Sequence, residues 1–167
     1  MIRLIRVTRR LLPIAVASTM AATLSTPAWA GEALKIANIV ELSGAGATSG
    51  TNFKNGIELA VKEINASGGI LGRQIETSTA DTQSNPGVAK GLVTKAIDDN
   101  VFAVFGPVFS GSIMVSMAET RRAEVPNFTG GEAAAITKQG NPYIFRTSFR
   151  QDTAMPKVAR YIAQRRQ

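Results

Sequence analysis

The chain of 167 residues contains neither cysteine nor histidine. Without cysteine it can form no disulfide and has no thiol nucleophile. Without histidine it has no Ser/His/Asp triad, and the usual zinc ligands are missing as well. The phosphate-binding motif G-x-x-x-x-G-K-[ST] is also absent. Many classes of enzyme are thereby excluded, although a composition of 44% hydrophobic and 19% charged residues is that of an ordinary globular protein.

The basic side chains are concentrated at the start of the chain, where four arginines lie within ten residues: Arg3, Arg6, Arg9 and Arg10. A short apolar run, residues 11–24, and the small–bulky–small sequence Ala28-Trp29-Ala30 follow them. This order is typical of a secretory signal peptide, here residues 1–30, which is cleaved after Ala30. The arginine pair fits general secretion and, more loosely, twin-arginine export.

The mature chain, residues 31–167, is much less basic than the whole. Removing residues 1–30 takes away four basic and no acidic side chains, so the net charge falls from +7 to +3. No basic patch interleaved with aromatic residues remains, and a nucleic-acid backbone has little to bind. The sequence therefore predicts an exported protein that binds no nucleic acid and does not stay in the membrane after cleavage.

Strand-like and helix-like segments alternate along the mature chain. Strands are predicted over residues 34–40, 74–80 and 101–105, and each precedes a stretch with apolar residues at helical spacing. Asn85-Pro86 suits the N-cap and first position of the second helix. This repetition predicts an α/β fold, a Rossmann-like parallel sheet with flanking helices and with its ligand at the carboxyl ends of the strands.

The remaining segments follow the same pattern less completely. A short extended segment, residues 125–128, precedes a loop over residues 129–142, an extended stretch over 143–149 and a last amphipathic helix. No strand follows this helix. We therefore expect a chain that is truncated within its fold.

The glycine-rich loop LSGAGATSG, residues 42–50, follows the first strand and raises the question of a dinucleotide site. Gly44 and Gly46 fit the G-x-G-x-x-G pattern, but Ser49 holds the third position and Gly50 comes one residue late. Asp81, the candidate for the ribose, lies too far along the chain. The spacing argues against a dinucleotide. The glycines either permit the turn or leave space for a smaller ligand.

Two later loops carry candidate ligand-binding residues. In GPVFSGS, Ser110-Gly111-Ser112 open a helix at a strand end, where hydroxyls and free N–H groups suit a carboxylate and also cap the helix. In the next loop, Gly130 and Gly131 precede Glu132. Glu132 or Glu41 could receive an ammonium group, or each could be a solvated surface charge.

Four stretches in order, NGIELAVKEINASGGILGRQIE, ADTQSNPGVA, GPVFSGS and NPYIFRTSF, resemble the amino-terminal half of the type I periplasmic binding proteins of branched-chain amino acid ABC transporters. The resemblance implies a two-lobe fold, in which residues 31–147 are an incomplete first Rossmann-like lobe. Residues 148–167 would then be the hinge and the first helix of the second lobe. It also implies a monomeric periplasmic protein, not an enzyme, without cofactor or metal.

The same resemblance implies a function and a set of ligand contacts. Such a protein closes over an amino acid or related small carboxylate and delivers it to a membrane permease. The ligand-binding positions fall on Ser110, Gly130, Glu132 and Ser49, beside Gly111, Ser112 and Gly131. Glu132 stands where leucine-binding members have threonine, and Ser49 where they often have an aromatic residue, so the ligand is left open. One lobe alone is expected to bind at best on the order of millimolar.

Three other readings stay open at this point. A sensor or receptor can use the same fold as its ligand-binding domain. A chain cut within its fold can be a nonfunctional fragment. An enzyme with a nucleotide cofactor is the third, which the loop spacing disfavours.

Overall fold

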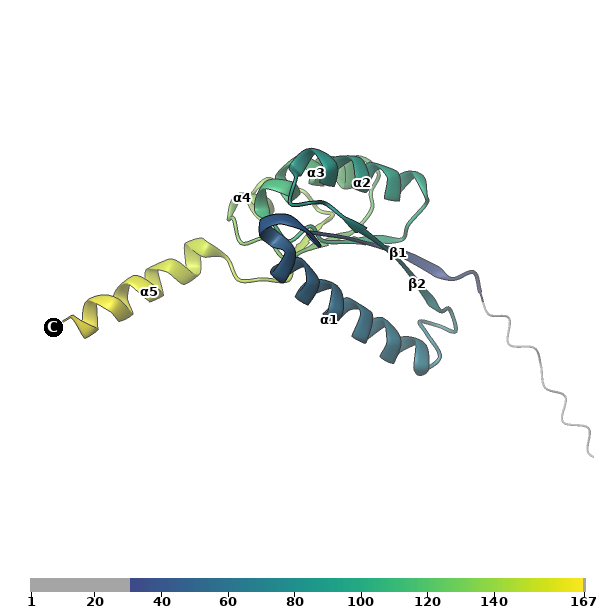
Figure 1. Cartoon of the computed structure of the whole chain (residues 1–167), viewed down its shortest axis with the longest axis horizontal. Coiled ribbons are helices and arrows are strands. Elements are labelled where there is room, and N and C mark those ends of the chain that lie inside the picture. The colour runs from purple at the N-terminus through teal and green to yellow at the C-terminus, as the bar shows by residue number, and fades with distance from the viewer. Residues whose placement is uncertain (1–30, 167) are drawn as a thin grey trace, which may run out of the picture.

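The computed structural model describes residues 31–166, and the predicted signal peptide lies outside the described residues. Five parallel strands form one sheet in the order β2-β1-β3-β4-β5 (Figure 1). The strands are β1 Leu34–Val40, β2 Ile75–Asp81, β3 Ala103–Phe105, β4 Asn127–Thr129 and β5 Ile144–Arg146. The helices are the 3-10 turn η1 Gly44–Gly46, then α1 Ala47–Ala66, α2 Pro86–Asp98, α3 Ser110–Arg122, α4 Ala135–Lys138 and α5 Gln151–Arg165.

The predicted fold class and most of the predicted elements are confirmed. β1 has the expected bounds, and the start of α2 has the expected cap. The Asn85 side chain accepts hydrogen bonds from the backbone N–H groups of Gly87 at 2.8 Å and Val88 at 3.2 Å, while Pro86 opens the helix. These bonds satisfy donors that have no partner within the helix.

The structure differs from the sequence-based expectation at two places. Helix α1 begins at Ala47, inside the glycine-rich loop. Its Gly50 lies so close to the Glu41 carbonyl that an added Cβ would overlap it, so this position requires glycine. Helix α4 occupies part of the segment expected to be a loop. It is short, and its Ile136 is fully buried beside Ile113 and Ile144, so tertiary packing holds it in place.

Helices α2 and α3 lie side by side on one face of the sheet (Figure 1). The core under α2 consists of small and branched residues from the strands and the helix: Ala37, Ile39, Val93, Ala96, Val101 and Val104. A second cluster joins Ile113 and Met117 of α3 to Ile136 and Ile144. These helices therefore cover most of this face, while Ser78 on the edge strand β2 stays exposed.

The opposite face is covered only in part. Helix α1 contacts β1 and β2 on this side and stands alone below the sheet (Figure 1). Beyond it, Phe105, Phe128 and Phe145 are register partners on β3, β4 and β5, and neighbouring rings stack with centroids 5.0 Å apart. Phe145 is 44% exposed. An aromatic stripe thus stays open to solvent in the described chain.

Helix α5 leaves the carboxyl end of the sheet and extends away from the body (Figure 1). None of its described residues is buried, although Met155, Val158, Tyr161 and Ile162 place apolar side chains on it. Its role as the first helix of a second lobe remains a prediction. Neither α5 nor any other helix within residues 31–166 is long and apolar enough to cross a membrane.

The difference between the two sheet faces predicts different costs of mutation. Val104→Ala opens a cavity at a fully buried position and should lower the free energy of unfolding by about 2 kcal/mol. Phe145→Thr removes a half-exposed ring from an edge strand and should cost no more than about 1 kcal/mol. Urea unfolding of both variants measures this. A larger loss for Phe145→Thr would show that the aromatic stripe is covered in solution.

Candidate functional site

The loops after β1 and β3 meet at the point where the strand order reverses, which is where parallel α/β sheets bind ligands. Glu41, directly after β1, is fully buried between them. Its carboxylate accepts hydrogen bonds from the backbone N–H groups of Val108 at 3.0 Å and Phe109 at 3.2 Å. The interpretation of Glu41 as a solvated surface charge is therefore wrong. Its oxygens already hold the loop that leads into α3.

Asp81, at the end of β2, holds the glycine-rich loop from the other side. Its carboxylate accepts a 2.6 Å hydrogen bond from the Ser43 hydroxyl and a 2.7 Å bond from the backbone N–H of Leu42. The Ser43 hydroxyl is the main cause that lowers the pKa of Asp81. Partial burial opposes it, and the N–H groups of Gln83, Leu42 and Ser43 add to the lowering. Asp81, which the sequence analysis considered as a ribose ligand, thus uses its carboxylate for hydrogen bonds within the protein.

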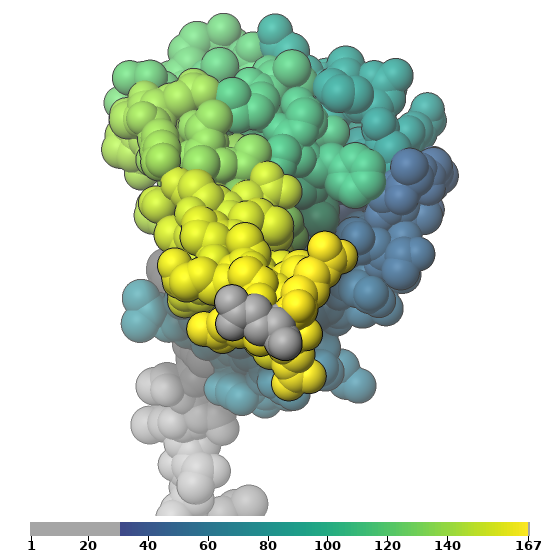
Figure 2. Space-filling model, turned by 90° about the vertical axis from the view of Figure 1, so that its left-hand side faces the viewer, coloured from purple at the N-terminus to yellow at the C-terminus, as the bar shows by residue number. Residues whose placement is uncertain are grey.

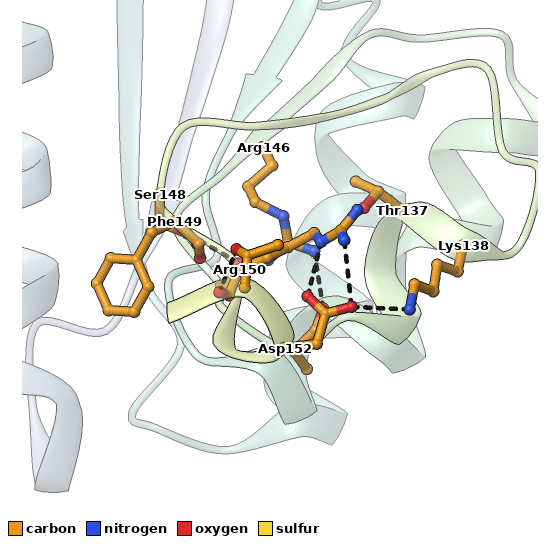
Figure 3. A network of polar contacts seen from close by, with 10 residues as sticks. Thr137, Lys138, Arg146, Ser148, Phe149, Arg150 and Asp152 are labelled. Atoms are coloured by element: carbon orange, nitrogen blue, oxygen red, sulfur yellow. Dashed lines mark hydrogen bonds and ion pairs between the residues drawn. The ribbon is translucent and has the colours of Figure 1, made fainter. Parts of the chain in front are cut away.

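The loop after β4 is held by side chains from β5 and the segment after it. The Arg146 guanidinium donates to the carbonyl oxygens of Gly131 and Ala133, the latter at 2.7 Å, and the Ser148 hydroxyl donates to Gly131 at 3.0 Å (Figure 3). These bonds satisfy backbone oxygens that a buried loop would otherwise leave without partners. The backbone on both sides of Glu132 is therefore held in place by these hydrogen bonds.

A charged cluster connects α4 with the start of α5. Asp152 accepts from Lys138 at 2.8 Å and from Arg150 at 2.8 Å (Figure 3). The bond from Lys138 and then that from Arg150 lower the pKa of Asp152 to about 2. The ion pairs fix how α5 leaves the sheet, while Phe149 points away from them (Figure 3).

A hollow of about 270 Å³ opens at this carboxyl edge of the sheet and is lined by Ser49, Val108, Phe109, Ser110, Gly130, Glu132 and Gln151. Four of the predicted ligand-binding residues, Ser49, Ser110, Gly130 and Glu132, therefore lie on one surface. In Figure 2, α5 in yellow stands before the body on this side, between the blue first loop and the green segments above it.

Three other hollows are larger. Two, of about 390 and 440 Å³, lie around Lys35 toward the amino ends of β1 and β2, and one of about 280 Å³ lies between β2 and α2. They are away from the strand-end loops. Since ligands of such sheets bind at the carboxyl ends of the strands, we take the smaller hollow, hereafter the strand-end pocket, as the candidate site.

The other three predicted residues lie outside the lining of the strand-end pocket. Gly111 is exposed, and Ser112 is 1% exposed with a hydroxyl that has no partner among the described residues. Gly131 is buried, and an added Cβ there would overlap the side chains of Ile113 and Ile136. The ligand role of these residues remains a prediction.

Val108, Phe109 and Gln151 line the pocket but were not among the predicted residues. Phe109 precedes α3, and its ring lies beside Gly46 of the first loop. Val108 and Phe109 could have been predicted to line the pocket, because a chain that turns at a strand end exposes its side chains to the crevice. Gln151 gave no such signal, since it comes from the segment after β5.

The chain belongs to the periplasmic binding protein family, whose model matches residues 33–167. It is 32% identical over 146 residues to a Leu/Ile/Val-binding protein of Rhizobium johnstonii, which covers 87% of this chain and 40% of that protein. A Leu/Ile/Val-binding protein homolog of Brucella abortus is 31% identical and covers 86% and 35%. This chain thus spans well under half the length of the curated relatives it matches. The family consists of binding proteins, not enzymes.

Two crystal structures share the fold. The branched-chain amino acid transporter substrate-binding protein LivJ of Streptococcus pneumoniae, in complex with isoleucine, has a TM-score of 0.69 and 36% identity over 71% of this chain and 34% of that one. A solute-binding protein of an ABC transporter from Rhodopseudomonas palustris, in complex with 3,4-dihydroxybenzoic acid, has a TM-score of 0.73 and 25% identity over 80% and 36%. The resemblance stated from the sequence motifs is confirmed.

The buried position of Glu41 predicts a large effect of a small change. Glu41→Gln replaces one acceptor oxygen by an amide group, which cannot accept from Val108 or Phe109, and should lower the free energy of unfolding by about 2 kcal/mol. Glu58→Gln is the control, because its ion pair with Lys54 is exposed and worth no more than about 0.5 kcal/mol. Urea unfolding that gives the same small loss for both variants would contradict the role assigned to Glu41.

The lowered pKa of Asp81 predicts a pH-dependent contribution to stability. An unfolded aspartate titrates near pH 3.9, so below that pH the unfolded chain binds the proton first. The contribution is fully present above about pH 4 and is lost as pH falls through the lower folded pKa. Asp81→Asn should therefore cost less stability at about pH 3 than at pH 7. An equal cost at both pH values in urea unfolding would refute the assignment.

Proposed function

We propose that the chain forms the first lobe of an exported solute-binding protein, which binds an amino acid or related small carboxylate and delivers it to the permease of an ABC transporter. The observation that carries this proposal is the position of Ser110. It opens α3 inside a pocket built by the loops that follow β1, β3 and β4.

The start of α3 is suited to hold a carboxylate. The Ser110 hydroxyl oxygen accepts a 3.2 Å hydrogen bond from the backbone N–H of Ala133, so its own proton can be donated to a ligand. The first N–H groups of a helix have no partner within the helix, and the helix dipole favours negative charge there. Hydroxyl and backbone donors would thus act on the same ligand group.

The ligands of the relatives agree with such a site. Isoleucine in the Streptococcus pneumoniae structure and 3,4-dihydroxybenzoic acid in the Rhodopseudomonas palustris structure differ in shape, but both carry a carboxyl group. A carboxylate site on the first lobe would serve both classes. The variable part of the ligand would then be read by residues around that site.

Closure by a second lobe would complete the binding. The pocket of the described chain is lined in part by Gln151, the first residue of α5. The relatives are longer than this chain and have room for a second lobe. Such a lobe would exclude water from the pocket and strengthen the polar contacts to the ligand. The chain by itself should bind on the order of millimolar. The predicted signal peptide and the membership of the periplasmic binding protein family support the proposal that it acts in the periplasm.

Replacing Ser110 tests the carboxylate site. Ser110→Ala removes the donor and should weaken leucine binding by about fivefold. Ser78→Ala, on the exposed edge strand β2, should leave binding unchanged. Binding is measured by titrating labelled protein with leucine and following backbone amide shifts of Ser49, Ser110 and Gly130. Unchanged affinity in Ser110→Ala would contradict the proposed site.

A further inference from the structure

We propose that the part of the sheet that α1 leaves open is a docking surface for a second copy of this chain. In the pair, α5 of each copy lies across the aromatic stripe of the other. This inference does not rest on the proposed function, because neither surface belongs to the strand-end pocket beyond the first residue of α5. It departs from the monomer that the resemblance implies.

The open part of the sheet has the size of one helix. Helix α1 packs against β1 and β2, and it leaves the aromatic stripe on β3, β4 and β5 open to solvent. These three strands span two strand spacings, or about 10 Å. A helix with its side chains is also about 10 Å across. One further helix would therefore complete the layer on this face.

Helix α5 carries a surface that fits the aromatic stripe. Its large apolar residues recur at helical spacing along one side: Met155, Val158, Tyr161 and Ile162. By the same spacing, Lys157 and Arg160 lie on the other side of the helix. A helix docked through its apolar side would thus keep these two charges in water.

The start of α5 is held away from the stripe of its own copy. The backbone N–H of Gln151 donates to the carbonyl oxygen of Glu132 at 3.1 Å, and Asp152 pairs with Lys138 of α4 at 2.8 Å (Figure 3). Helix α4 packs against α3 through Ile136, on the face opposite the stripe. Bringing α5 back under its own sheet would break these bonds. A contact between two copies keeps them.

A second copy satisfies both bare surfaces at once. Each chain has a helix without a sheet and half a sheet without a helix. If two copies exchange α5 about a twofold axis, the two contacts are identical and the assembly closes as a dimer. A membrane or another protein bound to α5 would leave the aromatic stripe bare.

The apolar surface available is enough for a specific dimer. Six large side chains of each copy would enter the two contacts, and each is 44–55% exposed in the single copy: Phe145, Phe149, Met155, Val158, Tyr161 and Ile162. At about 200 Å² for a large side chain, their exposed parts amount to roughly 600 Å² per copy. The pair would bury roughly 1,200 Å², which is the lower end of stable interfaces.

Sedimentation velocity of the chain without its predicted signal peptide tests the dimer. We expect a monomer that becomes a dimer with a Kd on the order of micromolar. Ile162→Glu places a charge inside the contact and should weaken the dimer by about tenfold or more. Gln164→Glu is the control, because it adds the same charge on the other side of the same helix. Both positions are exposed in the single copy, so neither change disturbs its fold.

A second pair of variants tests the stripe. Phe145→Thr should also weaken the dimer by about tenfold, whereas Phe102→Thr, at the amino end of the sheet and 61% exposed, should leave it unchanged. In the dilute monomer the stripe is open, so the small stability cost given above for Phe145→Thr holds there. That cost should grow at concentrations where the dimer forms.

Single-cysteine variants show which surfaces meet, because the chain has no cysteine of its own. A mixture of Phe145→Cys and Ile162→Cys chains, treated with a short thiol crosslinker, should give a covalent mixed dimer in high yield. The mixture of Phe145→Cys and Gln164→Cys chains is the control and should give little. Equal yields would show that α5 does not lie on the stripe and would overturn the inference.

Three further results would overturn it and leave the proposed function standing. The first is a chain that stays monomeric at millimolar concentration. The second is an equal loss of dimer in Ile162→Glu and Gln164→Glu. The third is a series of larger oligomers in place of a closed dimer. A monomer that adsorbs to phosphatidylglycerol vesicles, and loses this in Ile162→Glu, would assign α5 to a membrane surface instead.

Discussion

Two hydrogen bonds from the backbone of Val108 and Phe109 to the buried carboxylate of Glu41 set the geometry on which the strand-end pocket depends. They join the loop after β1 to the loop after β3 where the strand order reverses. Where two neighbouring parallel strands are followed by helices on opposite faces of the sheet, a crevice forms between their carboxyl ends. A charged group buried in that crevice is stable only while its acceptors are satisfied, so the two loops cannot separate without a large cost.

The other strand-end contacts extend this constraint outward. Asp81 holds the glycine-rich loop against β2, and Arg146 holds the loop after β4. These side chains use their polar groups on the protein itself. The Ser110 hydroxyl proton and the Glu132 carboxylate are left over, and both lie on the lining of the same pocket. The loops are thus hydrogen-bonded to the protein where they meet one another. Where they face the crevice, they leave polar groups that can contact a ligand.

The sequence predicted the fold and the strand-end loops because local signals and the fold agree. Apolar periodicity located β1 and α2, and Asn85-Pro86 located a helix start that its capping bonds confirm. Glu41 could not be placed this way, because a glutamate after a strand is as compatible with solvent as with two backbone donors 67 and 68 residues away. The same holds for Arg146 and α4. Their positions depend on tertiary contacts that leave no local pattern in the sequence.

Under the proposed function, the described chain would supply one wall of a binding site. Ser110 and Glu132 lie on the lining of its strand-end pocket, while its aromatic stripe and α5 remain uncovered in the described chain. The most direct test is a crystal structure of the chain grown in saturating leucine. The account predicts leucine in the strand-end pocket, with its carboxylate at Ser110 and its ammonium group at Glu132. Leucine bound elsewhere, or in the reverse orientation, would contradict it.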